Sequence, residues 1–393
     1  MRLVRPSIST LDSDPSKLRN TALDGLRGVA IALVLIHHLN IFSDGSVDPS
    51  IWDVATEFMS HGVDLFFCLS GYLICRQLGA APLGANQIGR FWLRRIAKIF
   101  PAYLAAIIVT FVVLPWVLPT IGLRNPAVIS GSVNGSWVWY AAFSSNLLNA
   151  SNGRFTNPAI DVAWSLAVEV QFYVLVTFLA ATCSRSRFTQ VLAVCTITSA
   201  VARIFSVYLG LNWIQIMVLT WNRLDAFALG FLISRASDDF RRPILASSIL
   251  GLAVLVPTLP WSRENPTVQI AGYSIVALGF SALIAELVSN DGGVLARALS
   301  APWLRWLGLV SYSLYLTHIP VRALTRDLMF GSREGAASVT SLGFRLMYYI
   351  TAAIACLVTG WIVWRYIEGP CQRGILALSA RGSPPRNEVP ENS

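Results

Sequence analysis

An arginine and a histidine share one face of the first apolar segment of the chain. Arg27 and His38 are eleven positions apart, which leaves them about 20° from alignment on a helix and separates them by roughly 16 Å along its axis. Histidine is the usual general base near neutral pH, and a guanidinium group binds phosphates and carboxylates. The spacing predicts that Arg27 lies near the entrance of the helix and His38 about half a membrane deeper on the same face, while His37 points about 100° away. The alternative is that Arg27 reaches the membrane surface and the histidines bond to neighbouring helices.

A second polar stripe lies in the middle of the chain. Asp161, Ser165 and Glu169 recur at i, i+4 and i+8, and Glu169 lies well inside an apolar segment. An ionisable group in hydrocarbon costs at least ~2.5 kcal/mol, so it needs a partner or a function. We predict that Glu169 is catalytic and orients the imidazole of His38. The alternative is a structural ion pair with an arginine on another helix, for which the candidates are Arg203 and Arg223.

Other polar groups in apolar segments are predicted to face an acceptor substrate or to be structural. Ser311, Tyr315 and His318 recur at i, i+4 and i+7, and Pro320 is expected to end that helix. The complete acceptor-side or structural set is Asp64, Ser70, Asp161, Ser165, Arg223, Asp225, Tyr315 and His318. No glycine-rich phosphate loop, zinc motif or nucleophile elbow is present in the sequence, so no metal site is predicted.

The elements that position these residues must cross a membrane. Of the 393 residues, 54% are hydrophobic and only 13% are charged, whereas soluble domains carry about 25% charged residues. The mean hydropathy is +0.58. The six cysteines are scattered without disulfide or metal spacing. This composition excludes a secreted disulfide scaffold, a disordered chain and an ordinary cytosolic enzyme.

The apolar segments predict an all-α, polytopic membrane helical bundle of about ten transmembrane helices. The expected spans are 25–41, 62–78, 101–118, 161–183, 189–209, 222–235, 243–259, 268–289, 303–321 and 341–365. Arginine-rich connections alternate with arginine-poor ones, which predicts a multi-pass protein of the cell (inner) membrane with both termini cytoplasmic. We expect a cytoplasmic N-terminal segment at 1–24, a transmembrane domain at 25–370 and a cytoplasmic, disordered tail at 371–393.

Six ordered motifs resemble the acyltransferase-3 family of integral membrane acyltransferases. They read LDGLRG from residue 23, GVDLFFCLSGYLI from 62, RRIAKIFP from 94, WSLAVEVQFY from 164, RLDAF from 223 and SYSLYLTH from 311. The resemblance implies transfer of an acyl group, usually acetyl, from acyl-CoA to a hydroxyl of a glycan or lipid-linked sugar, as in polysaccharide O-acetylation. It implies no bound cofactor, acetyl-CoA as donor substrate, contact with membrane lipid and no nucleic acid.

The resemblance also implies roles for individual residues. His38 matches the catalytic histidine, and Arg95 and Lys98 match an Arg-x-x-Arg motif in which Lys98 departs from the pattern. The implied acyl-donor residues are Arg27, Arg94, Arg95 and Lys98. Two other functions remain open, which are O-acylation of a macrolide or similar metabolite and a secondary transporter or flippase with a His and Glu proton relay. The sequence shows no internal repeat of the kind that many transporters carry.

Overall fold

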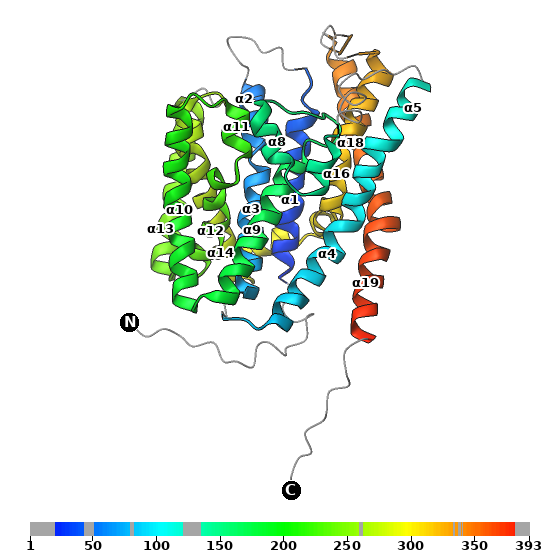
Figure 1. The fold of residues 1–393 in the computed structure, drawn as a ribbon. Helices are drawn as coiled ribbons and strands as arrows, with labels where there is room; N and C mark the ends of the chain where they lie inside the picture. The colour runs from blue at the N-terminus through cyan, green and yellow to red at the C-terminus, as the bar shows by residue number, and fades with distance from the viewer. Residues whose placement is uncertain are drawn as a thin grey trace.

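The computed structural model describes residues 20–42, 51–78, 82–120, 135–258, 262–332, 335–336, 339 and 341–381. The expectations for residues 1–19 and for the tail from residue 382 lie outside these ranges. Within them every regular element is a helix, and the helices form an upright bundle (Figure 1). The predicted polytopic helical bundle is confirmed.

The elements follow one another in a simple up-and-down order (Figure 1). They are α1 (Thr21–Leu39), α2 (Ile51–Met59), α3 (Gly62–Leu78), α4 (Ala85–Ile108), η2 (Val109–Val113), α5 (Leu114–Thr120), α7 (Trp137–Ala141), α8 (Ser145–Asn152), α9 (Ala163–Thr182), α10 (Arg185–Tyr208), α11 (Trp213–Val218), η3 (Thr220–Asn222), α12 (Leu224–Ser234), α13 (Asp238–Thr258), η4 (Val268–Gly272), α14 (Tyr273–Ser289), α15 (Val294–Leu299), α16 (Pro302–Phe330), α18 (Leu342–Val363), η5 (Trp364–Glu368) and α19 (Gly369–Arg381).

Seven helical stretches in the described residues are long and apolar enough to cross a membrane. The helices α12, α13 and α16 run beside them (Figure 1). The start of α1 and the end of α19 lie at the same end of the bundle, the lower end in Figure 1. The path of the chain through the described helices is therefore the up-and-down path that the apolar segments predict.

Three helices extend past the limits expected from hydropathy. Helix α4 begins at Ala85 and not at residue 101, because Arg90 and Arg94 lie on an exposed side while Phe91 is buried on the other. Pro320 does not end α16, which continues to Phe330; a proline removes one backbone hydrogen bond, and here the neighbouring turns keep the helix intact. The last helix runs to Arg381, since α19 packs along α4.

Helices α1 and α16 approach each other closely. A Cβ atom built on Gly28 would lie 2.2 Å from the carbonyl oxygen of Leu304, and one on Gly308 would lie 1.9 Å from that of Asp24. Only glycine permits such backbone contact, as in other membrane helix pairs. The helix that carries Arg27 and His38 is thereby held against the helix that carries Tyr315 and His318.

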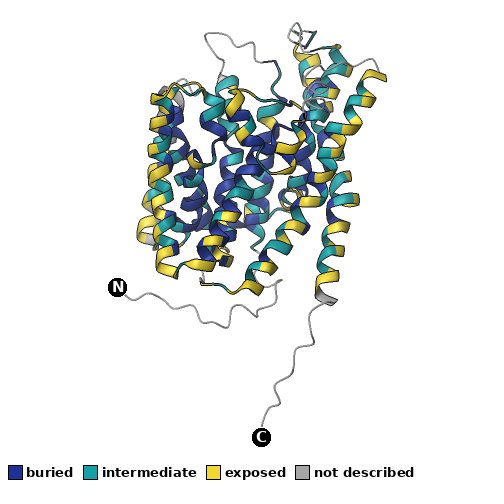
Figure 2. Cartoon of the chain, in the orientation of Figure 1, coloured by how far each residue is buried: buried dark blue, intermediate teal, exposed yellow. Residues whose placement is uncertain are grey.

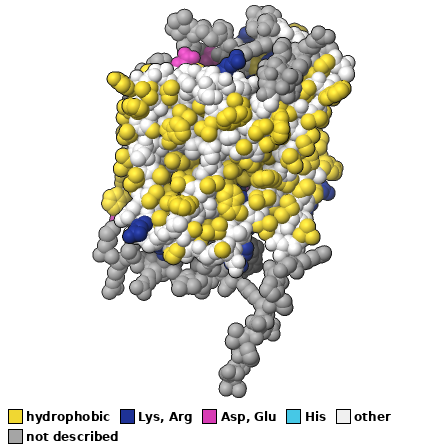
Figure 3. Space-filling model, in the orientation of Figure 1, with side chains coloured by type: hydrophobic (Ala, Val, Ile, Leu, Met, Phe, Trp, Pro, Cys, Tyr) yellow, Lys and Arg dark blue, Asp and Glu magenta, His cyan; other side chains and the backbone are white. Residues whose placement is uncertain are grey.

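The surface suits a lipid environment. Buried residues gather on the inner helices, and the outer helices expose one side (Figure 2). Hydrophobic side chains cover the face shown in Figure 3, and Lys and Arg side chains appear near its margins. Helix α10 alone exposes Val194, Ile197, Val201, Ile204 and Phe205. A soluble protein rarely exposes an apolar surface of this extent, so these residues are expected to face lipid.

Candidate active site

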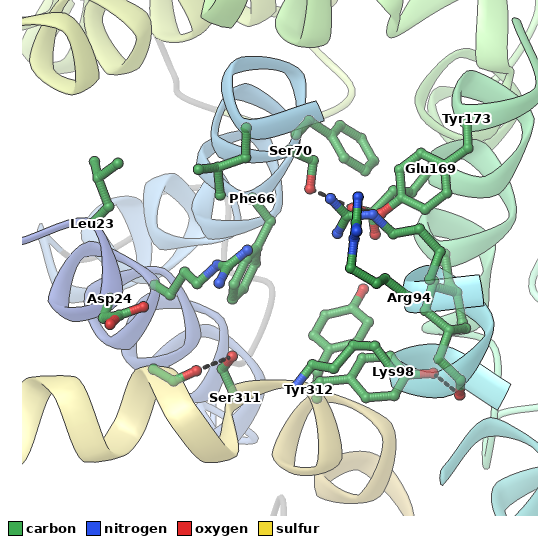
Figure 4. Close-up of a pocket in the computed structure, with 18 of the residues that line it drawn as sticks. Leu23, Asp24, Phe66, Ser70, Arg94, Lys98, Glu169, Tyr173, Ser311 and Tyr312 are labelled. Atoms are coloured by element: carbon green, nitrogen blue, oxygen red, sulfur yellow. Dashed lines mark hydrogen bonds between the residues drawn. The ribbon is translucent and has the colours of Figure 1, made fainter. Parts of the chain in front are cut away.

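A cavity of about 620 Å³ lies among α1, α3, α4, α9 and α16. It reaches one end of the bundle, where Asn20 precedes α1 and Arg76 lies in the last turn of α3. Figure 4 shows Leu23 and Asp24 on one side and Arg94 and Lys98 on the other. The charged lining residues are Arg27, Arg76, Arg94, Arg95, Lys98, Asp24 and Glu169. The excess of cations makes the cavity a site for an anion.

Two of these cations have open hydrogen-bonding groups among the described residues. Neither Arg27 nor Arg94 has a hydrogen bond or ion pair there to another side chain. A guanidinium group presents five N–H donors in a planar fork that matches a phosphate. The structure thus brings together the four predicted donor residues and leaves two of them with open hydrogen-bonding capacity.

The other two predicted donor residues are held by protein groups. The guanidinium of Arg95 lies 5.3 Å from the ring centre of Phe91 and 5.4 Å from that of Tyr173. Lys98 donates to the buried carboxylate of Glu368, whose second oxygen accepts a 2.5 Å hydrogen bond from Ser313. Lys98 therefore ties α4 to η5 and α16 while its charge still lines the cavity.

Glu169 lies in the cavity, where its contacts are with Ser70 and Tyr173. Its Oε1 atom accepts hydrogen bonds from Ser70 and, at 2.5 Å, from Tyr173. The structure does not show the expected contact with His38, since Glu169 shares the cavity with Arg27, which lies roughly 16 Å below His38 along α1. Helical periodicity places the glutamate inside the bundle but does not give its depth relative to another helix.

The deep end of the cavity is formed by two hydroxyl groups. The Oη atom of Tyr315 lies 2.7 Å from Ser165 Oγ and 3.0 Å from the carbonyl oxygen of Val162. Both side chains line the cavity. These contacts join α16 to α9 one helical turn below His318.

A pair of histidines lies directly beyond Tyr315. The rings of His38 and His318 are 4.9 Å apart, and the ring of Tyr315 is 5.7 Å from that of His318. Nδ1 of His38 lies 2.9 Å from the carbonyl oxygen of Val34, and Nδ1 of His318 lies 2.7 Å from that of Tyr315. A carbonyl only accepts, so each Nδ1 carries the proton and each Nε2 keeps a basic lone pair. Nε2 of the buried His318 has no hydrogen-bond partner within the described part of the chain.

His37 belongs to a different set of contacts, as helical geometry predicts. Its Nδ1 atom donates to the carbonyl oxygen of Thr56 at 2.7 Å, and its Nε2 atom accepts from Arg263. Arg263 also pairs with Glu57 at 2.5 Å. Both ring nitrogens of His37 are therefore occupied, whereas Nε2 of His38 has no hydrogen bond to any residue in the described ranges.

Several residues of the predicted acceptor-side or structural set form ion pairs with other buried side chains. Asp64 pairs with Arg223 and with His61, and Asp225 pairs with Arg203 at 2.8 Å. All of these side chains are buried. The alternative in which Arg203 or Arg223 pairs with Glu169 is thus wrong, because both arginines have other carboxylates as partners.

Asp161 lies outside the stripe expected on α9. The helix begins at Ala163, and the Asp161 carboxylate accepts from Tyr140 Oη at 2.5 Å and from the backbone N–H of Asn157 at 2.6 Å. Burial raises the pKa of Asp161 to about 7, against the opposing effect of these hydrogen bonds. This residue fixes the turn that leads into α9.

Sequence reasoning missed three residues of the site. Tyr173 is four positions after Glu169, a spacing that predicts contact on a helix, and Arg76 lies near the end of a predicted span. Glu368 follows the expected end of the last span by three residues, and hydropathy gave no reason to place it in the bundle. Within the described residues, no group of three or more His, Cys, Asp or Glu side chains is arranged to hold a metal ion.

Comparisons with known proteins agree with the motifs. A putative peptidoglycan O-acetyltransferase, YrhL of Bacillus subtilis (strain 168), is 28% identical over 91% of this chain and 56% of its own length. The O-acetyltransferase OatA of Staphylococcus aureus (strain NCTC 8325 / PS 47) is 26% identical over 89% of this chain and 57% of its own. The chain therefore spans little more than half the length of these relatives. No solved structure matches.

The family comparison covers most of the chain. The acyltransferase-3 family, described as an acyltransferase domain, matches residues 20–365. That range contains all six sequence motifs, the cavity residues from α1 to α16, and the histidine pair. The chain belongs to the acyltransferase-3 family.

Proposed function

We propose that this protein is a membrane-bound O-acyltransferase that moves an acetyl group from acetyl-CoA to a hydroxyl of a glycan or lipid-linked sugar. The observation that carries the proposal is the cationic cavity, which Arg27 and Arg94 line without a hydrogen-bond partner among the described residues. The cavity is large enough to hold part of an extended acetyl-CoA molecule, and it reaches the end of the bundle. That end is the cytoplasmic end in this proposal, where acyl-CoA is present.

The donor's phosphates belong at the wide, cationic end. Arg27 and Arg94 supply free guanidinium groups, and Arg95, held over two aromatic rings, adds a third charge. Lys98 contributes charge but is anchored to Glu368. The pantetheine arm then extends along α9 toward Ser165 and Tyr315, which brings the thioester next to the histidine pair once it has passed the Tyr315 ring.

The histidine pair supplies the proton chemistry. Nε2 of His38 accepts the proton of the acceptor hydroxyl while that oxygen attacks the thioester carbonyl. The tetrahedral intermediate collapses, the carbon–sulfur bond breaks, and the thiolate of CoA takes the proton from the imidazolium of His38. His318 holds a second basic Nε2 next to the first ring and can share the proton during the step. The products are an acetyl ester and free CoA.

The acceptor is a carbohydrate hydroxyl in this proposal. One relative is named a putative peptidoglycan O-acetyltransferase, and the glycan strand of peptidoglycan is therefore the first acceptor to test. Its sugars are too polar to cross the membrane, so this acceptor reaches the histidine pair from the other end of the bundle. The protein is then a multi-pass protein of the cell membrane.

The test measures CoA release by the purified protein in lipid nanodiscs. With acetyl-CoA and soluble peptidoglycan fragments, we expect free thiol and acetyl ester to form in equal amounts. Acetyl-CoA with the His38→Ala variant is the control for background hydrolysis. A wild-type protein that neither binds CoA nor releases thiol from acetyl-CoA would overturn the proposal.

A further inference from the structure

We propose that Glu169 binds an amide N–H of the pantetheine arm and so sets how far the acyl donor enters the protein. This inference rests on the proposed function, since it assigns a second contact for the same donor. It gives Glu169 a binding role in the cavity in place of the catalytic role beside His38 that its sequence position suggested.

The first observation is that the two oxygens of Glu169 are unequal. Ser70 and Tyr173 both donate to Oε1. Oε2 has no hydrogen bond or ion pair to any residue that the structure describes, and the side chain lines the cavity (Figure 4). An ionised carboxylate accepts up to about four hydrogen bonds, and a carboxylate in a low-dielectric site needs them. The geometry therefore leaves one oxygen for a donor group that comes from a ligand.

The second observation is the position of Glu169 along α9. Ser165, at the deep end of the cavity, is one turn away in one direction, and Tyr173, which lies under Arg95, is one turn away in the other. Each step is about 6 Å along the helix axis. A donor whose phosphates meet Arg94 and Arg95 and whose thioester reaches Tyr315 must pass this level. The part that passes is the pantetheine arm, whose polar donors are amide N–H groups and a hydroxyl.

The negative charge of Glu169 also favours entry of the pantetheine end of the donor over the phosphate end. A carboxylate repels phosphate and attracts an N–H group. The anionic end of CoA is thereby kept at the level of Arg27 and Arg94, and the uncharged arm is accepted beyond it. Glu169 thus limits how far the phosphates can enter the cavity toward the histidine pair.

The substitution Glu169→Gln tests this assignment sharply. Ser70 and Tyr173 both donate to Oε1, so we expect the amide oxygen of the introduced glutamine to keep these two contacts and its NH₂ group to take the place of Oε2. An acceptor is replaced by a donor at the position that meets the ligand. A hydrogen bond to a charged group is lost and a donor–donor contact is formed, so we expect at least about a tenfold loss of affinity for the amide-bearing arm.

Two fragments of CoA separate the sites. Nanodisc-embedded protein is loaded with fluorescent CoA and titrated with S-acetylpantetheine, which lacks the phosphates of CoA, or with adenosine 3′,5′-bisphosphate, which lacks the arm. Glu169→Gln is expected to weaken S-acetylpantetheine about tenfold or more and to leave the bisphosphate within about twofold. Arg94→Ala is the reciprocal control and is expected to weaken only the bisphosphate.

The outcomes are distinct. Unchanged bisphosphate binding shows that the Glu169→Gln protein is folded, so a loss confined to S-acetylpantetheine supports the site. Equal losses for both fragments, or no loss for S-acetylpantetheine, would remove Glu169 from the arm and overturn this inference alone. Failure of the wild-type protein to bind fluorescent CoA would instead overturn the proposed function.

Discussion

Arg203 differs from Arg27 and Arg94 in how many of its N–H groups are hydrogen-bonded to the protein. Arg203 donates to the carbonyl oxygens of Ile270 and Asn222, at 3.2 and 2.5 Å, and to the carboxylate of Asp225 at 2.8 Å. Arg27 and Arg94 have no such partner in the described residues. The hydrogen-bonded Arg203 (the saturated region) joins α10, η3, α12 and η4. Arg27 and Arg94, whose N–H groups lack such partners (the unsaturated region), line the cavity.

The difference separates an arginine that is paired within the fold from arginines that face a cavity with open hydrogen-bonding groups. A charge inside a membrane protein is tolerated when it is fully paired or when it faces a water-filled cavity. The first condition yields a fixed helix arrangement, and the second yields a binding site. The state of the hydrogen-bonding groups, and not the residue type, therefore indicates function here.

The largest expected effect is a loss of acetyl transfer when His38, beyond the deep end of the cavity, is replaced. His38→Ala should lower acetyl transfer by ~10²–10⁴-fold, because the general base is lost, while the protein still accumulates in the membrane. His37→Ala is the matched control and should keep substantial activity, since both of its ring nitrogens bond to protein groups. Transfer from radiolabelled acetyl-CoA in membranes with matched protein levels measures both. A fully active His38→Ala protein would refute the mechanism.

The next largest effect is a loss of stability when Arg203 is replaced. Arg203→Ala leaves the buried carboxylate of Asp225 without its cation, so we expect a loss of about 3–5 kcal/mol in the free energy of unfolding. Thermal unfolding in detergent would show it as a lower Tm and a lower yield.

A rescue experiment distinguishes this effect from a catalytic one. Adding Asp225→Asn to Arg203→Ala removes the unpaired charge, and Ser274 remains as a hydrogen-bond partner at that position. The double variant should regain part of the lost stability. An Arg203→Ala protein with normal stability but a raised KM for acetyl-CoA would break the division between the two regions.

A smaller effect is expected for Arg94, which the proposed function assigns to phosphate binding. Arg94→Ala should raise the KM for acetyl-CoA about tenfold and leave kcat nearly unchanged, because a contact far from the reacting carbon binds ground and transition states alike. Arg90→Ala is the control on the same helix, as Arg90 is exposed and does not line the cavity. Steady-state kinetics with varied acetyl-CoA decide the matter, and identical KM changes for the two variants would point to general electrostatics.

The smallest effect concerns the residue that belongs to both regions. Lys98 lines the cavity but is paired with Glu368. Lys98→Arg keeps the pairing and restores the Arg-x-x-Arg pattern, so we expect kcat/KM within about twofold of the wild type. Lys98→Met leaves Glu368 buried and unpaired and should lower Tm as well. A large activity loss in Lys98→Arg would mean that the point charge of lysine, and not the pairing, is what matters.

Sequence reasoning predicted the helical bundle well because hydropathy directly reflects burial in lipid. It failed where charged residues occur in helices, as in the first turns of α4, which its arginines made look like a loop. Spacing on one helix correctly separated His37 from His38 and gathered Tyr315 with His318.

Contacts between helices could not be obtained in this way. The partner of Glu169 was expected to be His38, and the structure shows Ser70 and Tyr173. Periodicity fixes the direction of a side chain around its own axis, but the relative height of two helices depends on how loops and small residues let them pack. The cavity depends on five helices at once, so its shape was beyond the reach of single-segment patterns.

The close contact between α1 and α16 has a consequence for motion. At Gly28 and Gly308 the two backbones meet without intervening side chains, so the two helices pack as a close pair. We therefore expect the groups that these two helices carry at the deep end and the entrance to keep their mutual distances. We therefore expect changes in the shape of the cavity to come from α4, whose outer side is exposed. One wall of the cavity is then expected to be rigid, and the opposite wall is expected to move when a ligand enters or leaves.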